Sequence, residues 1–293
     1  MSSINPRHTS QFLKKPIFKN GLREILECIN VLEQKVSQQR LENKGLDVVT
    51  MDTLAYCYLE AREIGYLQKS VAMYGEILFI IYASPMSGMQ IDYAITIGNL
   101  AFAKFNLDTP MYVDALGVCN QIAYNGPAVA SIIVQELTSI LYPRGSLPRP
   151  IEPDLKQFIS NRLNQAFSVL SPLHNQESIE YVEVLFIMAK YNGYLLYKQD
   201  QEKELREQTI KAFDSVLACY LKVYGPIHPK YAMAMAYKSY AYTHRDEECT
   251  QLAMDAVPLV MQYYGELYIE VLLSPILSFG SNKYAMSCWY QNE

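Results

Sequence analysis

The stretch between residues 51 and 82 constrains the fold more than any other part of the chain. It reads MDTLAYCYLEAREIGYLQKSVAMYGEILFIIY. Leu54 and Tyr58 fall on one helical stripe, and a second apolar run with helical spacing follows Gly65. We interpret the stretch as two helices separated by a turn at Gly65. One such pair cannot bury both of its apolar faces, so it needs neighbours of the same kind.

Similar helical patterns recur along the chain. They cover residues 90–105, 111–124, 180–197, 206–225, 228–242 and 249–265. The second helices of successive pairs end in an aromatic residue, namely Tyr82, Tyr124, Tyr224 and Tyr264. Spacings of roughly 40 residues are typical of two-helix repeats. We therefore predict an all-α fold, in which antiparallel helix pairs stack as an α-solenoid between N- and C-terminal capping helices.

Two short motifs carry a family resemblance. The run Gly98-Asn99-Leu100-Ala101 resembles the core of tetratricopeptide repeats of the long, kinesin-light-chain type. The run from Val223 to Pro229 (VYGPIHP) is similar to the glycine and His-Pro junction between such repeats. The resemblance covers residues 48–130 and 176–266, although the Trp, Gly and Pro signature of the shorter repeats is absent.

The resemblance implies a role for Asn99. In that family an asparagine on the first helix clamps the backbone of an extended peptide, because its amide both donates and accepts hydrogen bonds. The equivalent positions here hold Thr53, Asn192 and Ser239, so the asparagine ladder is incomplete. We expect these four residues to line a protein-binding groove, with a solvated or interhelical amide as the alternative for Asn99.

Proline and charge divide the chain into segments. The run from Pro143 to Pro153 (PRGSLPRPIEP) carries four prolines and indicates a linker, or an insertion within one superhelix. We expect a polar basic arm at 1–18, helical repeats at 19–142, the linker at 143–153, and further repeats with an aromatic tail at 154–293. The arm is either a solvated tail or a docking arm.

The aromatic tail is a second candidate surface. It contains Trp289, the single tryptophan, beside Tyr290. Both residues are candidates for protein binding. The tail either covers the last repeat or enters a dimer contact, so a homodimer is an open alternative.

Charge and hydropathy limit the classes of partner. The net charge is −5 and the sequence pI is near 5.5, which argues against nucleic acid because phosphate contacts need a cationic face. The longest apolar run, residues 77–83, is far shorter than a membrane helix, so we expect no membrane insertion. Six cysteines without a CxxC pair and a polar N-terminus without a signal peptide favour a reducing, cytoplasmic location.

The sequence offers no convincing active site. It has neither a phosphate-binding glycine loop nor a nucleophile elbow, and its four histidines are scattered. His244 and Cys249 flank three acidic residues, but we interpret that run as a turn and helix start rather than a metal site. We expect no enzyme activity, no cofactor and no metal.

These observations favour a non-catalytic adaptor that binds another protein through a helical-repeat surface. Its expected setting is a cytoplasmic subunit of a larger assembly, such as a secretion-system chaperone or an effector-recruiting adaptor. The alternative is a ligand-gated regulatory receptor for a small peptide or metabolite. Convergent polar side chains in a groove would favour the receptor, and an exposed aromatic patch would favour the adaptor.

Overall fold

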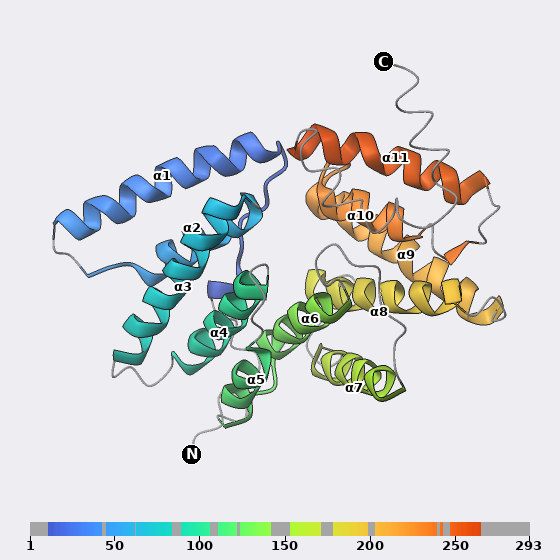
Figure 1. The fold of residues 1–293 in the computed structure, drawn as a ribbon, viewed down its shortest axis with the longest axis horizontal. Helices are drawn as coiled ribbons and strands as arrows, with labels where there is room; N and C mark the ends of the chain where they lie inside the picture. Colours follow the sequence, from blue (N-terminus) through green and yellow to red (C-terminus); the bar gives the residue numbers. More distant parts are fainter. Residues whose placement is uncertain are drawn as a thin grey trace. The chain divides into compact units, whose positions relative to one another are not determined.

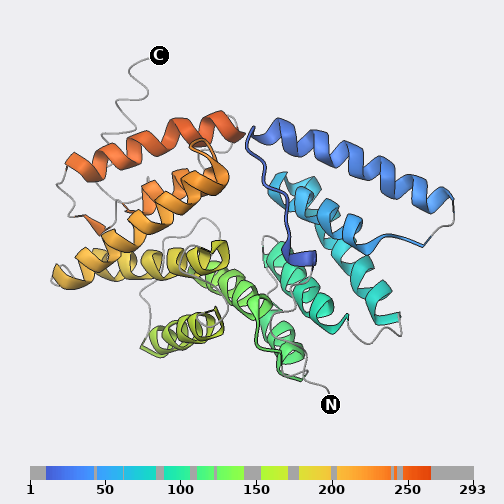
Figure 2. The ribbon, with the colours of Figure 1, turned by 180° about the vertical axis from the view of Figure 1, so that it is seen from behind.

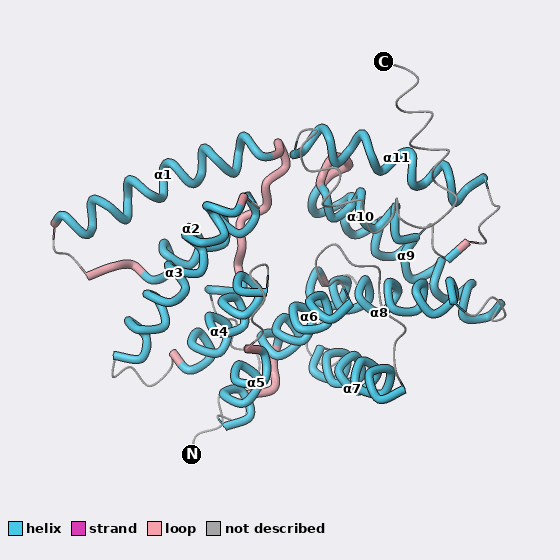
Figure 3. The backbone as a smooth tube through the Cα atoms, in the orientation of Figure 1, coloured by secondary structure: helices cyan, strands magenta, loops and turns pink. Residues whose placement is uncertain are grey.

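Every regular element in the described part of the chain is helical, and none is a strand (Figure 3). The computed structural model describes residues 11–42, 45–61, 63–83, 89–105, 111–121, 124–141, 153–170, 178–198, 203–238, 241–242 and 247–264. The predicted all-α fold is confirmed. The predictions for Ser239, Trp289, Tyr290 and residues 143–152 of the linker lie outside the described residues.

The helices form two compact units (Figure 1). The first unit holds the described residues within 1–17, 23–140 and 157–175. Its elements are η1 (Gln11–Leu13), α1 (Leu22–Leu41), α2 (Val48–Ala61), α3 (Ile64–Ala83), α4 (Gln90–Phe105), α5 (Tyr112–Gln121), α6 (Pro127–Leu141) and most of α7 (Pro153–Leu170).

The second unit is built on the last four helices. These are α8 (Ile179–Lys198), α9 (Lys203–Tyr224), α10 (Pro229–Lys238) and α11 (Glu247–Tyr264). The short segment Phe18–Leu22, the residue Leu141 and the first residues of α7 belong to the same unit. The sequence-based division places residues 154–170 with the C-terminal repeats. The contacts of α7 instead group most of that helix with the first unit, where Arg162 Nε lies 2.9 Å from Glu136 Oε2 of α6.

Successive helices pack against one another in each unit. In the first unit α2, α3, α4 and α5 follow in order, and in the second α8, α9, α10 and α11 do the same (Figure 2). Helix α10 also contacts α8. Each helix buries its apolar stripe between its neighbours, as Tyr74 and Ile77 of α3 show by being fully buried. This is the packing of an α-solenoid.

Side chains and turns set the helix ends. Asp47 caps α2, because its Oδ1 accepts a hydrogen bond from Val49 N at 3.1 Å. The junction that resembles the family motif closes α9 and opens α10. Gly225 takes a positive φ of 89°, which favours glycine, and His228 Nδ1 accepts from Lys230 N at 3.1 Å.

Two predicted boundaries were wrong. Gly65 does not separate the first helix pair, since α2 ends at Ala61 and α3 already begins at Ile64. One glycine costs a helix only about 0.5–1 kcal/mol, so the packing of α3 can hold Gly65 in its first turn. Residues 241–242 are not part of an α-helix, so α10, which is described to Lys238, does not reach the residue 242 that the sequence pattern suggested.

The aromatic residues predicted at the repeat ends do not share one environment. Tyr82 is 82% exposed at the end of α3, whereas Tyr124 and Tyr224 are buried. Tyr124 also lies beyond the end of α5 at Gln121. The regular spacing of these residues therefore reflects similar helix lengths rather than one repeated packing position.

Candidate functional site

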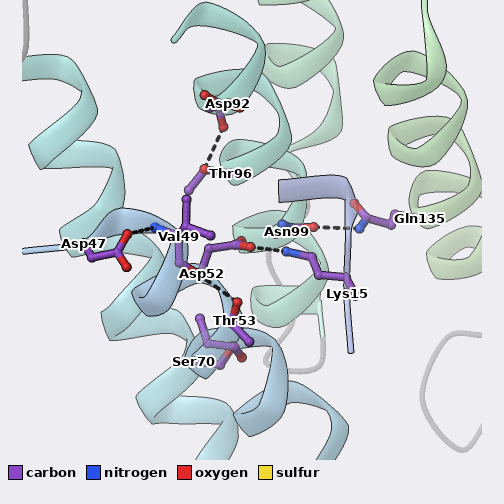
Figure 4. Close-up of polar contacts among 11 residues, drawn as sticks. Lys15, Asp47, Val49, Asp52, Thr53, Ser70, Asp92, Thr96, Asn99 and Gln135 are labelled. Carbon is purple, nitrogen blue, oxygen red and sulfur yellow. Dashed lines mark hydrogen bonds and ion pairs between the residues drawn. The ribbon is translucent and has the colours of Figure 1, made fainter. Parts of the chain in front are cut away.

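A close approach of α4 and α6 positions the first part of the candidate site. Gly98 of α4 has no side chain, and a Cβ there would lie 3.0 Å from Ile132 Cγ1 and 3.1 Å from Gln135 Oε1. Glycine thus lets the two helices touch. The next residue, Asn99, accepts a hydrogen bond at Oδ1 from Gln135 Nε2 at 2.9 Å (Figure 4).

A buried ion pair lies beside this amide pair. Asp52 of α2 is 1% exposed, and one of its carboxylate oxygens pairs with Lys15 Nζ (Figure 4). Burial raises the pKa of Asp52, although the charge and the hydrogen bond of Lys15 oppose that rise. Burial likewise lowers the pKa of Lys15. Loss of either partner would leave the other charge buried and uncompensated.

Lys15 comes from a segment that precedes the first helix. We name residues 11–17 the N-terminal strap: η1 opens it, and residues 14–17 continue as a loop without regular structure (Figure 3). Helix η1 contacts both α2 and α4, and its Phe12 is 1% exposed. Lys15 Nζ also lies 5.7 Å from the centre of the Tyr56 ring. The first helices of two successive pairs therefore hold a short piece of polypeptide.

Several buried polar atoms around Lys15 and Asn99 have no hydrogen-bond partner among the described residues. They are Asp52 Oδ1, Asn99 Nδ2, Gln135 Oε1 and the hydroxyl of Tyr74. Figure 4 shows the Asn99 amide nitrogen turned towards Asp52. Buried polar groups are normally satisfied, so a cluster of unsatisfied ones marks a place that can accept a polar ligand or water.

The described residues that the sequence grouped into one groove differ in their surroundings. Asn99 is 6% exposed and bonded to α6, while Thr53 donates its hydroxyl proton to the backbone oxygen of Val49 at 2.9 Å. Asn192 is half-buried on α8 of the second unit. A peptide-clamping role for these residues and for Ser239 stays a prediction.

The second unit contains a different buried charge. Lys190 of α8 is 5% exposed, and its Nζ lies 4.2 Å from the centre of the Tyr237 ring and 5.1 Å from that of Phe186. Burial lowers the pKa of Lys190 well below its ordinary value. A neighbouring pair, Glu183 Oε1 and Lys230 Nζ at 2.5 Å, lies nearer the surface.

Sequence reasoning did not select Lys15, Asp52 or Gln135. Asp52 does carry a local signal, because it shares a helical stripe with Ala55 and the largely buried Leu59, where a carboxylate is unusual. Lys15 carries none, since its partner lies 37 residues away. Only the fold brings the strap to α2.

The described residues contain no group of three or more metal-ligating side chains and no helix long and apolar enough to cross a membrane. The clusters described above are thus built from amide, carboxylate, ammonium and aromatic groups. Comparison of the chain with protein-family models, curated proteins and solved structures finds no match.

Proposed function

We propose that the protein is a non-catalytic adaptor that binds a short segment of another protein across α2 and α4. The observation that supports this most directly is the strap itself. These helices already hold a piece of polypeptide, and its Lys15 reaches the buried carboxylate of Asp52. Helical-repeat surfaces commonly bind peptides through such side-chain anchors.

The strap also indicates the chemistry of the partner. Phe12 fills an apolar position, and Lys15 follows three residues later with its ammonium group against Asp52 and Tyr56. A buried carboxylate discriminates strongly for a cation, since any neutral replacement leaves the charge uncompensated. The partner segment therefore presents an aromatic residue three positions before a lysine.

Such a partner competes with the strap. Its apparent affinity is reduced by the fraction of molecules in which the strap occupies the site. A substitution that loosens the strap should therefore tighten the binding of the partner segment. A substitution that removes the charge of Asp52 should weaken the binding of the strap and of the partner segment alike. This opposite response of two residues in one ion pair distinguishes a binding site from ordinary packing.

The test uses the full chain and a fluorescent synthetic peptide with the sequence of residues 10–18. Peptide binding is followed by fluorescence anisotropy for the wild type and for the Lys15→Met, Lys14→Met and Asp52→Asn variants. We expect Lys15→Met to bind the peptide up to about 100-fold more tightly than the wild type, as a loss of about 3 kcal/mol in the competing strap implies. The exposed Lys14 is the matched control and should leave the affinity unchanged.

Three results would contradict the proposal. They are equal affinities for the Lys15 and Lys14 variants, undiminished binding to Asp52→Asn, and unchanged binding of a peptide in which methionine replaces the Lys15 position. Circular dichroism of each variant establishes that its helices are intact before binding is compared.

Exposed aromatic side chains give the adaptor further support. Phe79 and Tyr82 of α3 are 73% and 82% exposed and lie one helical turn apart. An exposed aromatic surface of this kind fits a protein-binding adaptor better than a receptor for a small ligand. The unsatisfied polar atoms near Asn99 favour that receptor as a second candidate. A metabolite that raises the melting temperature of the wild type but not of Asn99→Ala would support it.

A further inference from the structure

A pair of thiols joins α1 to α2 in the first unit. Cys57 Sγ of α2 lies 3.6 Å from Cys28 Sγ of α1. Both cysteines are free, Cys57 is fully buried, and Cys28 is half-buried. A disulfide bond is about 2.0 Å long, so side-chain movement of about 1.5 Å would join the two sulfur atoms.

We propose that Cys28 and Cys57 form an oxidisable dithiol, a modification site whose oxidant is a hydroperoxide. The two sulfurs have distinct roles. Cys28 is the more accessible and meets the oxidant first, while the Cys57 thiol points at the Cys28 sulfur as a hydrogen-bond donor. Burial also raises the pKa of Cys57 far above its ordinary value, which keeps it a thiol until Cys28 has reacted.

The reaction has two balanced steps. With hydrogen peroxide as the oxidant, the Cys28 thiol gives up its proton and its sulfur attacks one peroxide oxygen. The O–O bond breaks, and the departing hydroxide takes up that proton to leave as water. Cys57 then attacks the sulfenic sulfur of Cys28, the S–O bond breaks, and a second water leaves with the Cys57 proton. The two thiols lose two electrons and two protons in total, and one peroxide is reduced to water.

The bond would tether α1 to α2. It would close a loop between residues 29 positions apart and so reduce the conformational freedom of the unfolded chain. Disulfides in a reducing compartment are usually transient, and this one is expected to be reversed by small thiols.

The test treats the full-length protein with hydrogen peroxide and measures its intact mass and its tryptic peptides. We expect the chain to lose two hydrogens and to yield one cross-linked species joining the peptides of Cys28 and Cys57. Dithiothreitol should reverse both changes. The Cys57→Ser variant should instead trap a sulfenic acid on Cys28 that dimedone labels, and Cys28→Ser should leave Cys57 unmodified.

The buried Cys119 is the internal control and should remain a thiol throughout. In urea the unfolded chain should no longer favour the bond between Cys28 and Cys57, and disulfides should form among all six cysteines. The proposal is overturned if the native chain oxidises to sulfinic acid without the cross-link, if another pair forms first, or if oxidation moves the urea midpoint of unfolding to lower concentration.

Discussion

Replacing Lys15 by methionine tests the buried ion pair most directly. Methionine keeps much of the lysine stem but leaves the Asp52 carboxylate, 1% exposed, without its cation. Removing one partner of a buried pair costs about 3–5 kcal/mol. The carboxyl group can limit this cost by taking up a proton, which at pH 7 requires about 4 kcal/mol for an ordinary pKa near 3.9. We therefore expect the free energy of unfolding to fall by about 3–4 kcal/mol at pH 7.

The expected loss depends on pH, and its sign follows from the direction of the pKa shift. Burial already holds the pKa of Asp52 above its ordinary value, and without Lys15 it rises further. The folded variant thus binds a proton more readily than the unfolded chain, so its stability falls as pH rises through this range. At pH 5 protonation costs only about 1.5 kcal/mol, and the loss should shrink to about that value.

Urea unfolding followed by circular dichroism at pH 7 and pH 5 measures the loss in the free energy of unfolding. The exposed Lys14→Met is the matched control and should change stability by less than about 0.5 kcal/mol. The double variant Lys15→Met with Asp52→Leu should recover most of the loss, because it leaves no buried charge. Equal losses at the two pH values, or an equally large effect at Lys14, would refute the reasoning.

Two further predictions concern packing and the second buried charge. Gly98→Ala should lower stability by about 1–3 kcal/mol, because its Cβ would press on Ile132. In contrast, Gly75→Ala, which meets open space in α3, should raise stability by about 0.5–1 kcal/mol. Urea unfolding followed by circular dichroism measures both changes. The lowered pKa of Lys190 means that the folded state binds fewer protons than the unfolded one, so stability should rise from pH 7 to pH 9. Lys190→Met should abolish that rise in urea unfolding while the exposed Lys211→Met preserves it, and an unchanged slope in the Lys190 variant would contradict the assignment.

The sequence was sufficient to predict the class of fold and most helices. Apolar periodicity predicted α4 at residues 90–105 and α9 at residues 206–225, close to the ends that the structure gives these helices. These signals are local, because each depends on residues within a few turns of one helix. The same local information placed a break at Gly65, where the chain continues as helix.

The tertiary structure alone decided which polar residues meet. Asn99 was selected from the sequence, but its partner Gln135 lies 36 residues away on a helix that only the glycine at position 98 admits so closely. Lys15 and Asp52, and likewise Cys28 and Cys57, come together because separate helices and the strap pack on one another. Periodicity reports which face of a helix is buried, whereas the identity of the side chain across that face depends on the packing of the whole unit.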